Sequence, residues 1–351
     1  MSGLGTSTRL RRGWALLAIA VTLVLVVWGA VAGSQVPDGF LEADPDKTDV
    51  ALYQAISERM GDGESYYVAV AAEQPARGFP TSPAVTVREP TLAWLTSTAG
   101  EGTAYGILLA LAAVAIGLSI VCFDSLTRTR AEWAVASVVG AVGVAALCSP
   151  DGVWIHETWA GLLTYVAALA ATRHWFWPAL IALLAACVVR ELALPAGLAV
   201  LAAAWPRLSV RRRLASVVAV AGFLAFYGWH VLQVGRMSAG ASEPSSGWLD
   251  VNGWPFFVNA AWFSTVLTVA PVLVAVLLVP LALLGWVLHD SVDARPVAAV
   301  LVAYALVFAV VGRDNNLYWG ILFGPLLLPG LAFAPRAVAR LTRAAHPRGA
   351  V

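Results

Sequence analysis

Ten apolar runs follow one another along the chain and leave little of it to face water. The runs cover residues 14–32, 104–122, 133–148, 155–171, 175–189, 192–205, 214–234, 266–288, 297–311 and 317–334. A helix needs about 20 residues to cross a hydrocarbon core of about 30 Å, and fewer where lipid is thin or protein covers its ends. Composition agrees, because 60% of the residues are hydrophobic and 12% are charged, against about 25% charged in soluble domains. We predict an all-α, polytopic transmembrane helix bundle of about ten membrane segments, two of them short.

The two shortest runs, residues 175–189 and 192–205, are separated only by Arg190 and Glu191. One straight helix through both runs would place this ion pair at mid-membrane, where ionisable residues are costly and usually functional. Arg173 precedes the first of these runs, and the arginine cluster at residues 207–213 follows the second. Positively charged segments stay on the cytoplasmic side, so the chain should return to the side that it left. We therefore predict two short helices that turn back at Arg190-Glu191. The alternative is one long tilted helix, which would place every later segment on the opposite side of the membrane.

With that turn, most of the arginines fall on one side of the membrane. They are Arg9, Arg11, Arg12, Arg128, Arg130, Arg173, the cluster at residues 207–213, Arg295, Arg336, Arg340, Arg343 and Arg348. Positive segments stay inside, so both termini are predicted to be cytoplasmic. Arginine outnumbers lysine 21 to 1, which is typical of a GC-rich bacterial genome and indicates the bacterial cytoplasmic (inner) membrane. The first run is longer than the apolar region of a signal peptide, about 7–15 residues, so it is interpreted as uncleaved; cleavage near Gly33 is the alternative.

The charge pattern argues against a nucleic-acid-binding protein and contributes to the domain assignment. The net charge is +1 and no basic run is interleaved with aromatic residues, so no nucleic-acid partner is predicted. We interpret residues 1–351 as a single membrane domain whose general partners are membrane lipids. It comprises a large outer loop over residues 35–102 and a helical membrane bundle over residues 103–334.

The outer loop is predicted to be partly helical, and loops of this length usually serve a function. Residues 49–60 are expected to form a helix with Thr48 or Asp46 as its cap. Residues 63–74 are expected to form a second helix capped by Asp62. A third short helix should begin at a proline, residue 90, since proline suits the first helical position.

Polar residues from four separated segments are predicted to meet on the outer side. The first loop contributes Asp49, Tyr53, Glu64, Tyr66, Tyr67 and Arg88, and later segments contribute His156, Glu157, Arg190, Glu191, Asn316, Tyr318 and Trp319. Carboxylates serve as general bases, and arginines hold phosphate through two parallel hydrogen bonds. These residue types together favour a pocket for an anionic lipid-linked or sugar-like substrate.

Each of these residues also has a structural interpretation. The first-loop acids can belong to first helical turns, where the helix dipole favours them, and the aromatic residues and Asn316 can anchor the chain at the membrane interface. Arg88 can be a solvated loop charge, and the hinge pair can be an ion pair at the outer surface. His156 and Glu157 can be a helix-start pair, or can contact a divalent metal ion, but no third ligand is evident and the metal site is unknown.

Several short stretches carry a family resemblance. They are Gly63-Glu64-Ser65-Tyr66-Tyr67, Gly78-Phe79-Pro80, Arg88-Glu89-Pro90, His156-Glu157-Thr158-Trp159-Ala160-Gly161, Arg190-Glu191-Leu192-Ala193-Leu194-Pro195 and Asn316-Leu317-Tyr318-Trp319-Gly320. With a first helix, a long outer loop and many further helices, the chain resembles the GT-C superfamily of membrane glycosyltransferases. The likeness is nearest to bacterial lipopolysaccharide-core and aminoarabinose transferases and to protein O-mannosyltransferases. That family usually has an acid where Gly63 stands, so an inactive relative is an alternative.

The resemblance implies an inverting glycosyltransferase that moves a sugar from a polyprenyl-phosphate carrier to an envelope glycan, lipid or protein acceptor on the outer face. Asp49 would deprotonate the acceptor hydroxyl, with Glu64 as the second candidate. Arg88 and Arg190 would hold the leaving phosphate, with Glu191 orienting Arg190, and the remaining polar residues would bind substrate. The alternatives are a lipid or solute transporter, favoured by a polar cavity at mid-membrane, and a non-catalytic membrane scaffold. A cavity beneath the first loop would favour the transferase.

Overall fold

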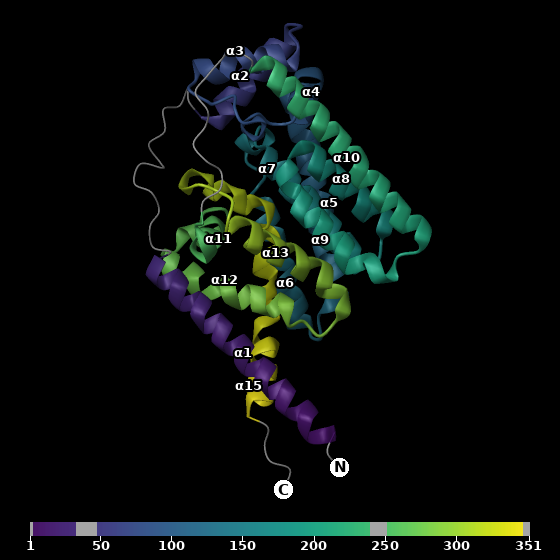
Figure 1. Cartoon of the computed structure of the whole chain (residues 1–351), viewed down its shortest axis with the longest axis vertical. Coiled ribbons are helices and arrows are strands. Elements are labelled where there is room, and N and C mark those ends of the chain that lie inside the picture. Colours follow the sequence, from purple (N-terminus) through teal and green to yellow (C-terminus); the bar gives the residue numbers. More distant parts are fainter. Residues whose placement is uncertain (1–2, 33–47, 239–250, 347–351) are drawn as a thin grey trace.

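A computed structural model of the chain describes residues 3–32, 48–238 and 251–346 (Figure 1). Within these ranges the secondary structure is helical and contains no strand, which confirms the predicted all-α class. Three helices are long and apolar enough to cross a membrane: α1 (Gly3–Ala32), α5 (Glu101–Leu126) and α10 (Val210–Met237). They coincide with three of the ten apolar runs. The count of ten crossings stays a prediction.

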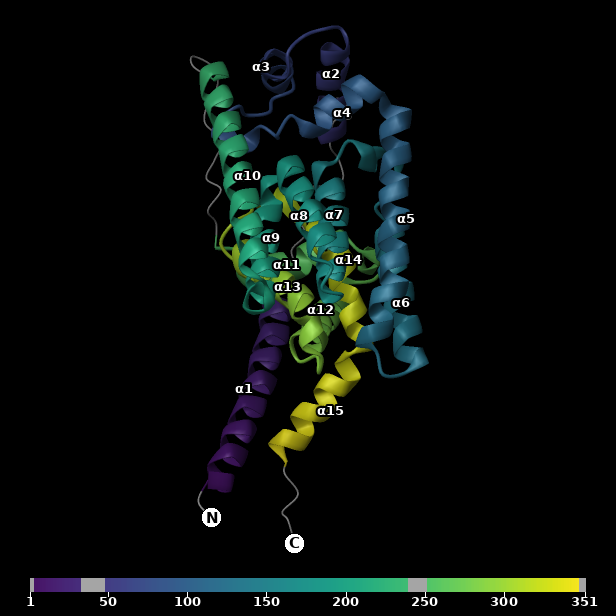
Figure 2. The ribbon, with the colours of Figure 1, turned by 90° about the vertical axis from the view of Figure 1, so that its right-hand side faces the viewer.

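Most of the other apolar runs form shorter helices, several of which lie between α5 and α10 (Figure 2). They are α6 (Arg130–Ala145), α7 (His156–Thr172), α8 (Phe176–Val189), α9 (Leu194–Ala204), α12 (Val272–Val287) and α13 (Arg295–Phe308). Helix α11 (Gly253–Phe263) lies outside the ten runs and is largely buried. At 1.5 Å per residue, α5 and α10 are about 39 and 42 Å long, whereas α8 is only about 21 Å long. The long helices therefore extend well beyond the short ones at one end of the molecule.

The predicted turn between the two shortest runs is present. Helix α8 ends at Val189, Arg190 has an extended backbone (φ −153°, ψ 115°), and a 3₁₀ turn over Glu191–Ala193 leads into α9. A Cβ added at Gly197 of α9 would lie 3.8 Å from the sulfur of Cys187 of α8, so the two helices run back along each other. The alternative of one long helix is excluded by this geometry.

The last apolar run, residues 317–334, is not the single helix that its hydropathy predicts. It is divided among η8 (Asp314–Leu322), α14 (Gly324–Leu327) and η9 (Leu328–Ala332), before α15 (Ala334–Ala345) begins. Prolines open the second and third pieces, and proline cannot continue the hydrogen-bond ladder of a helix. Glycines let the segment approach its neighbours closely, since an added Cβ at Gly320 would collide with the carbonyl oxygen of Ala260.

The first loop contains α2 (Asp49–Gly61), α3 (Tyr66–Ala76), η2 (Ala84–Thr86) and α4 (Thr91–Ala99). Thr48 caps α2 as predicted, since its hydroxyl oxygen accepts a hydrogen bond from the amide of Ala51 at 3.2 Å; the other proposed cap, Asp46, lies outside the described residues. The second helix was expected three residues too early. Gly63 has a left-handed backbone (φ 98°) that separates the two helices, so Asp62 ends α2 and Ser65 precedes α3.

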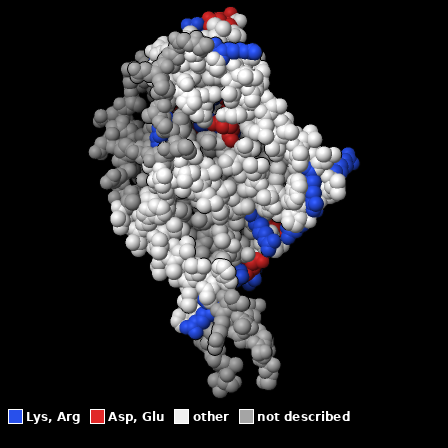
Figure 3. All heavy atoms as spheres, viewed as in Figure 1, with Lys and Arg blue, Asp and Glu red and all other residues white. Residues whose placement is uncertain are grey.

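The first loop covers one end of the bundle, here called the capped end. Its apolar residues pack on Val234 near the end of α10, and Ser238 just beyond α10 donates a hydrogen bond to the carbonyl of Thr81 at 2.9 Å. The opposite end, here called the arginine-rich end, holds the α5–α6, α7–α8, α9–α10 and α12–α13 connections, together with the start of α1 and the end of α15 (Figure 2). Figure 3 shows a broad uncharged band between charges at these two ends, as expected for lipid-facing surface.

Candidate functional site

A cluster of charged side chains lies beneath the first loop, where the turn between α8 and α9 meets the start of α7. Arg190 is its centre and is fully buried. Its Nε donates to Glu157 Oε1 at 2.7 Å, and its Nη1 donates to Glu191 Oε2 at 2.6 Å. Its Nη2 has no hydrogen-bond partner among the described residues. A buried guanidinium with two carboxylates is compensated for its lost hydration, so Arg190 holds the turn between α8 and α9 against the start of α7.

The ring of Trp319 completes the surroundings of Arg190. The guanidinium carbon lies 5.9 Å from the ring centroid, within the range of a cation–π contact. Trp319 is fully buried, so it does not belong to an interface belt. The neighbouring Asn316 is also buried, and its Oδ1 accepts a hydrogen bond from the amide of Arg313 at 3.1 Å. Asn316 therefore shapes the start of η8, a structural task that the sequence pattern did not distinguish from substrate binding.

Arg88 reaches the same cluster from the first loop. It is 8% exposed, and its Nη2 donates to the hydroxyl of Tyr318 at 3.0 Å and lies 4.0 Å from Glu157 Oε1. Its Nε has no hydrogen-bond partner among the described residues. Tyr66 donates to the carbonyl oxygen of Arg88 at 2.6 Å and so fixes its backbone. Glu157 thus lies between two buried arginines that come from distant parts of the chain.

Asp49 is the carboxylate of the cluster that suits proton transfer best. It is the first residue of α2 and is hydrogen-bonded to Tyr318, whose hydroxyl also accepts from Arg88. Burial raises the pKa of Asp49 above its ordinary value, and the positive charge of Arg88 opposes the increase. A partly buried carboxylate with a raised pKa is a stronger base once it is ionised.

Glu89 belongs to the cluster although the sequence pattern did not single it out. It is fully buried, and its Oε1 accepts a hydrogen bond from the amide of Glu191 at 3.0 Å. Burial raises the pKa of Glu89 well above its ordinary value, and the negative charge of Glu191 raises it further. A neutral Glu89 would support the turn at Arg190 without adding charge. In the sequence it is a loop acid beside a proline, and only its burial reveals this task.

His156 begins α7 and faces the first loop. Its ring lies 4.7 Å from the ring of Tyr53 in an edge-on arrangement, and both residues line a small cavity under α2, α3 and α4. The other walls of this cavity are mainly apolar and aromatic. Within the described residues, no group of three or more His, Cys, Asp or Glu side chains is arranged to hold a metal ion. The predicted divalent ion at His156 and Glu157 therefore stays a prediction.

The structure does not bring every predicted residue to the cluster. Glu64 is 37% exposed and pairs with Arg59 at 2.9 Å, at the far end of α2, about 18 Å from Asp49 by helix rise. Tyr67 contacts Nδ1 of His230 on α10 at 2.9 Å and ties the loop to that helix. His230, which also contacts the carbonyl of Val87 at 3.1 Å, is a structural link that its place in an apolar run did not reveal.

Comparisons with protein-family models, with curated proteins and with solved structures found no match to this chain.

Proposed function

We propose that the protein is an inverting glycosyltransferase that transfers a sugar from a polyprenyl-phosphate carrier to an acceptor of the cell envelope. The observation that supports this best is the Asp49–Tyr318–Arg88 chain, in which one tyrosine hydroxyl links a carboxylate to a buried arginine. Sugar transfer from a phosphate carrier needs a base for the acceptor and a cation for the departing phosphate. The cluster supplies both, under a loop that can exclude water.

The reaction assigns one role to each group. The ionised carboxylate of Asp49 takes the proton of the acceptor hydroxyl as its oxygen attacks the anomeric carbon. The bond between that carbon and the phosphate oxygen breaks, so the configuration inverts and polyprenyl phosphate departs. The guanidinium of Arg88 stabilises the negative charge that develops on this phosphate, and its unpartnered Nε is available for a second hydrogen bond. Tyr318, which is hydrogen-bonded to both, fixes the position of Asp49 relative to Arg88.

Arg190 acts through other residues in this proposal. Two of its nitrogen atoms are engaged by Glu157 and Glu191, which leaves Nη2 alone for a ligand. Its main effect is to hold Glu157 beside Arg88, so we assign it as a positioning residue. This departs from the expectation that both Arg88 and Arg190 hold the leaving phosphate.

The two alternatives are less well supported. A transporter needs polar groups along its passage, whereas this cluster lies at the capped end and the long helix α5 has its acidic residues only near its ends. A non-catalytic scaffold was favoured by Gly63, which lacks the usual acid. Gly63 lies beyond the far end of α2, beside Glu64, so an acid there would not join the cluster.

The base is tested by comparing Asp49→Asn with Glu64→Gln. Removal of a general base costs about 10²- to 10⁴-fold in rate, so Asp49→Asn should abolish transfer within detection while the protein still accumulates in the membrane. Glu64→Gln should retain transfer, because Glu64 lies outside the cluster. Mass spectrometry of envelope glycans and lipid carriers in a complemented deletion strain measures both. Full activity in Asp49→Asn would leave this mechanism without its base.

The phosphate contact is tested at Arg88. Arg88→Ala should weaken binding of a polyprenyl-phosphate sugar by roughly tenfold or more, the usual cost of a lost charged hydrogen bond. Arg88→Lys should restore part of the affinity, because lysine keeps the charge but lacks the planar fork. Donor affinity and thermal stability should be measured on the same purified proteins. Unchanged affinity in a folded Arg88→Ala protein would contradict the assignment.

A further inference from the structure

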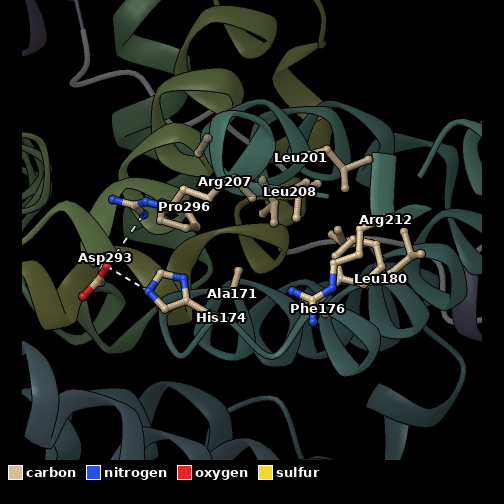
Figure 4. A pocket seen from close by; sticks show the side chains of 15 residues that line it. Ala171, His174, Phe176, Leu180, Leu201, Arg207, Leu208, Arg212, Asp293 and Pro296 are labelled. Atoms are coloured by element: carbon tan, nitrogen blue, oxygen red, sulfur yellow. Dashed lines mark ion pairs between the residues drawn. The ribbon is translucent and has the colours of Figure 1, made fainter. Parts of the chain in front are cut away.

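A second cavity lies at the arginine-rich end, far from the charged cluster. Figure 4 shows it between the end of α7, the start of α8, the end of α9 and the start of α10, with η7 (Val292–Ala294) on one side. Its volume is about 180 Å³, less than the roughly 300–1,000 Å³ of sites that enclose a whole drug-sized ligand. Most of its lining is apolar, including Ala179, Leu180, Leu183, Val200, Leu201 and Leu208.

The polar groups of this cavity stand around its mouth. Asp293 Oδ1 lies 3.2 Å from Nε2 of His174 and 3.7 Å from Nη1 of Arg207. Arg212 lies over the ring of Phe176, with its guanidinium carbon 5.5 Å from the ring centroid, and makes no ion pair with any described residue. Asp293 therefore compensates the charge of Arg207 only, and the guanidinium of Arg212 remains available to an anion.

The apolar interior continues away from the mouth. Leu180, Leu183 and Leu201 also line a narrower cavity between α8, α9 and α10, and Leu201 further lines a groove between α9 and α10. The groove is bordered by outward apolar side chains such as Leu198 and Val217 on the two helices. A charged mouth is thus joined to an apolar cleft that opens on the lipid-facing surface. A water-soluble anion would contact only the polar groups of the mouth, whereas a lipid would also fill the apolar cleft.

We propose that this site binds an anionic phospholipid, with its headgroup phosphate at Arg207 and Arg212 and an acyl chain in the cleft beside Leu201. The charge of the mouth complements the headgroup, and the hydrophobic effect stabilises the chain in the cleft. The lipid comes from the leaflet at the arginine-rich end. This proposal is independent of the proposed transferase activity, because none of its residues belongs to the charged cluster.

The test uses the full-length protein in detergent and native mass spectrometry with phosphatidylglycerol and with phosphatidylcholine of the same acyl chains. The wild type should retain phosphatidylglycerol more strongly. Arg207→Gln with Arg212→Gln should lower that retention by roughly tenfold, as expected for loss of charged hydrogen bonds. The matched control is Arg211→Gln with Arg343→Gln, which removes the same charge outside the cavity and should leave retention unchanged.

A second variant separates the lipid from a free anion. Leu201→Trp should fill the cleft and weaken phosphatidylglycerol binding while both arginines remain; it also serves if the double arginine variant fails to fold. Inorganic phosphate should not displace the lipid at equal concentration. Equal losses in the double arginine variant and its matched control, equal retention of both lipids, or displacement by inorganic phosphate would each overturn the proposal.

Discussion

The two ends of the bundle hold arginine in opposite ways. At the capped end, Arg88 and Arg190 are buried and contact carboxylate or hydroxyl groups from distant segments. At the arginine-rich end, Arg207 is about 44% exposed and Arg212 stands over an aromatic ring at a cavity mouth. Burial makes the first pair expensive to leave unpartnered, whereas solvent screens the second pair. The first arrangement fixes the positions of the charged side chains, and the second leaves the guanidinium groups available to a ligand that enters the cavity.

Helix length explains why the two ends differ. Helices α5 and α10 are about twice as long as α8, so their ends stand above the turn at Arg190 and support α2, α3 and α4 over it. The space enclosed there is filled by polar side chains, which must pair with one another. At the other end Arg207 and Arg212 are exposed, so their charges reach solvent. The same bundle thus encloses one set of charges and exposes the other.

The largest effect predicted from this comparison is all-or-none and concerns orientation. We place the capped end outside the cell and the arginine-rich end in the cytoplasm, because positive segments stay inside. Reporter domains fused after Arg343 should be active only as cytoplasmic reporters, and reporters inserted near Gly63 only as external ones. Export of the Arg343 fusion would reverse the sides assigned to the two ends.

The next largest effect should be on stability. Arg190→Ala leaves Glu157 and Glu191 without their buried cation, and breaking such a pair usually costs about 3–5 kcal/mol. Arg212→Ala, at the other end, should shift the unfolding midpoint little, because its guanidinium makes no ion pair among the described residues. Thermal unfolding of both variants in one detergent measures the difference. Equal midpoints would show that the buried cluster does not stabilise the fold.

The smallest predicted effect is a displaced pH profile. An ordinary aspartate has a pKa near 3.8, and burial raises the pKa of Asp49 above that value. Only the ionised carboxylate accepts a proton, so transfer should rise as the pH rises through the raised pKa and should level off above it. The acidic limb of kcat/KM against pH should therefore lie above the ordinary value. A limb at the ordinary value would mean that Asp49 is solvated during the reaction.

Stability should respond to the same group with the opposite sign. The folded protein binds the proton of Asp49 more tightly than the unfolded chain does, so this contribution to stability is present at low pH and is lost as the pH rises through the raised pKa. Asp49→Asn resembles the protonated form and should be no less stable than the wild type at neutral pH. This control separates loss of activity from loss of fold.

Residue patterns predicted the helical class, the Thr48 cap and the turn at Arg190, because each depends on neighbours close in sequence. They also predicted that acids, arginines and aromatic residues from four segments belong together. They ranked Asp49 ahead of Glu64 as the base but did not predict that the two acids lie far apart. The helix between them sends their side chains to opposite ends, and only the packing of the loop on α7 and α10 decides which end meets Arg88.

Three properties of this protein follow from its sequence alone: a chain too apolar for water, a bias of arginine to one set of connections, and a hinge at Arg190-Glu191. These depend on composition and local order, which a sequence contains in full. The burial of Glu89 and the hydrogen bonds that join Asp49 to Arg88 through Tyr318 depend on contacts between distant segments. Such contacts cost chain entropy and form only where packing compensates for it, so tertiary structure alone decides them.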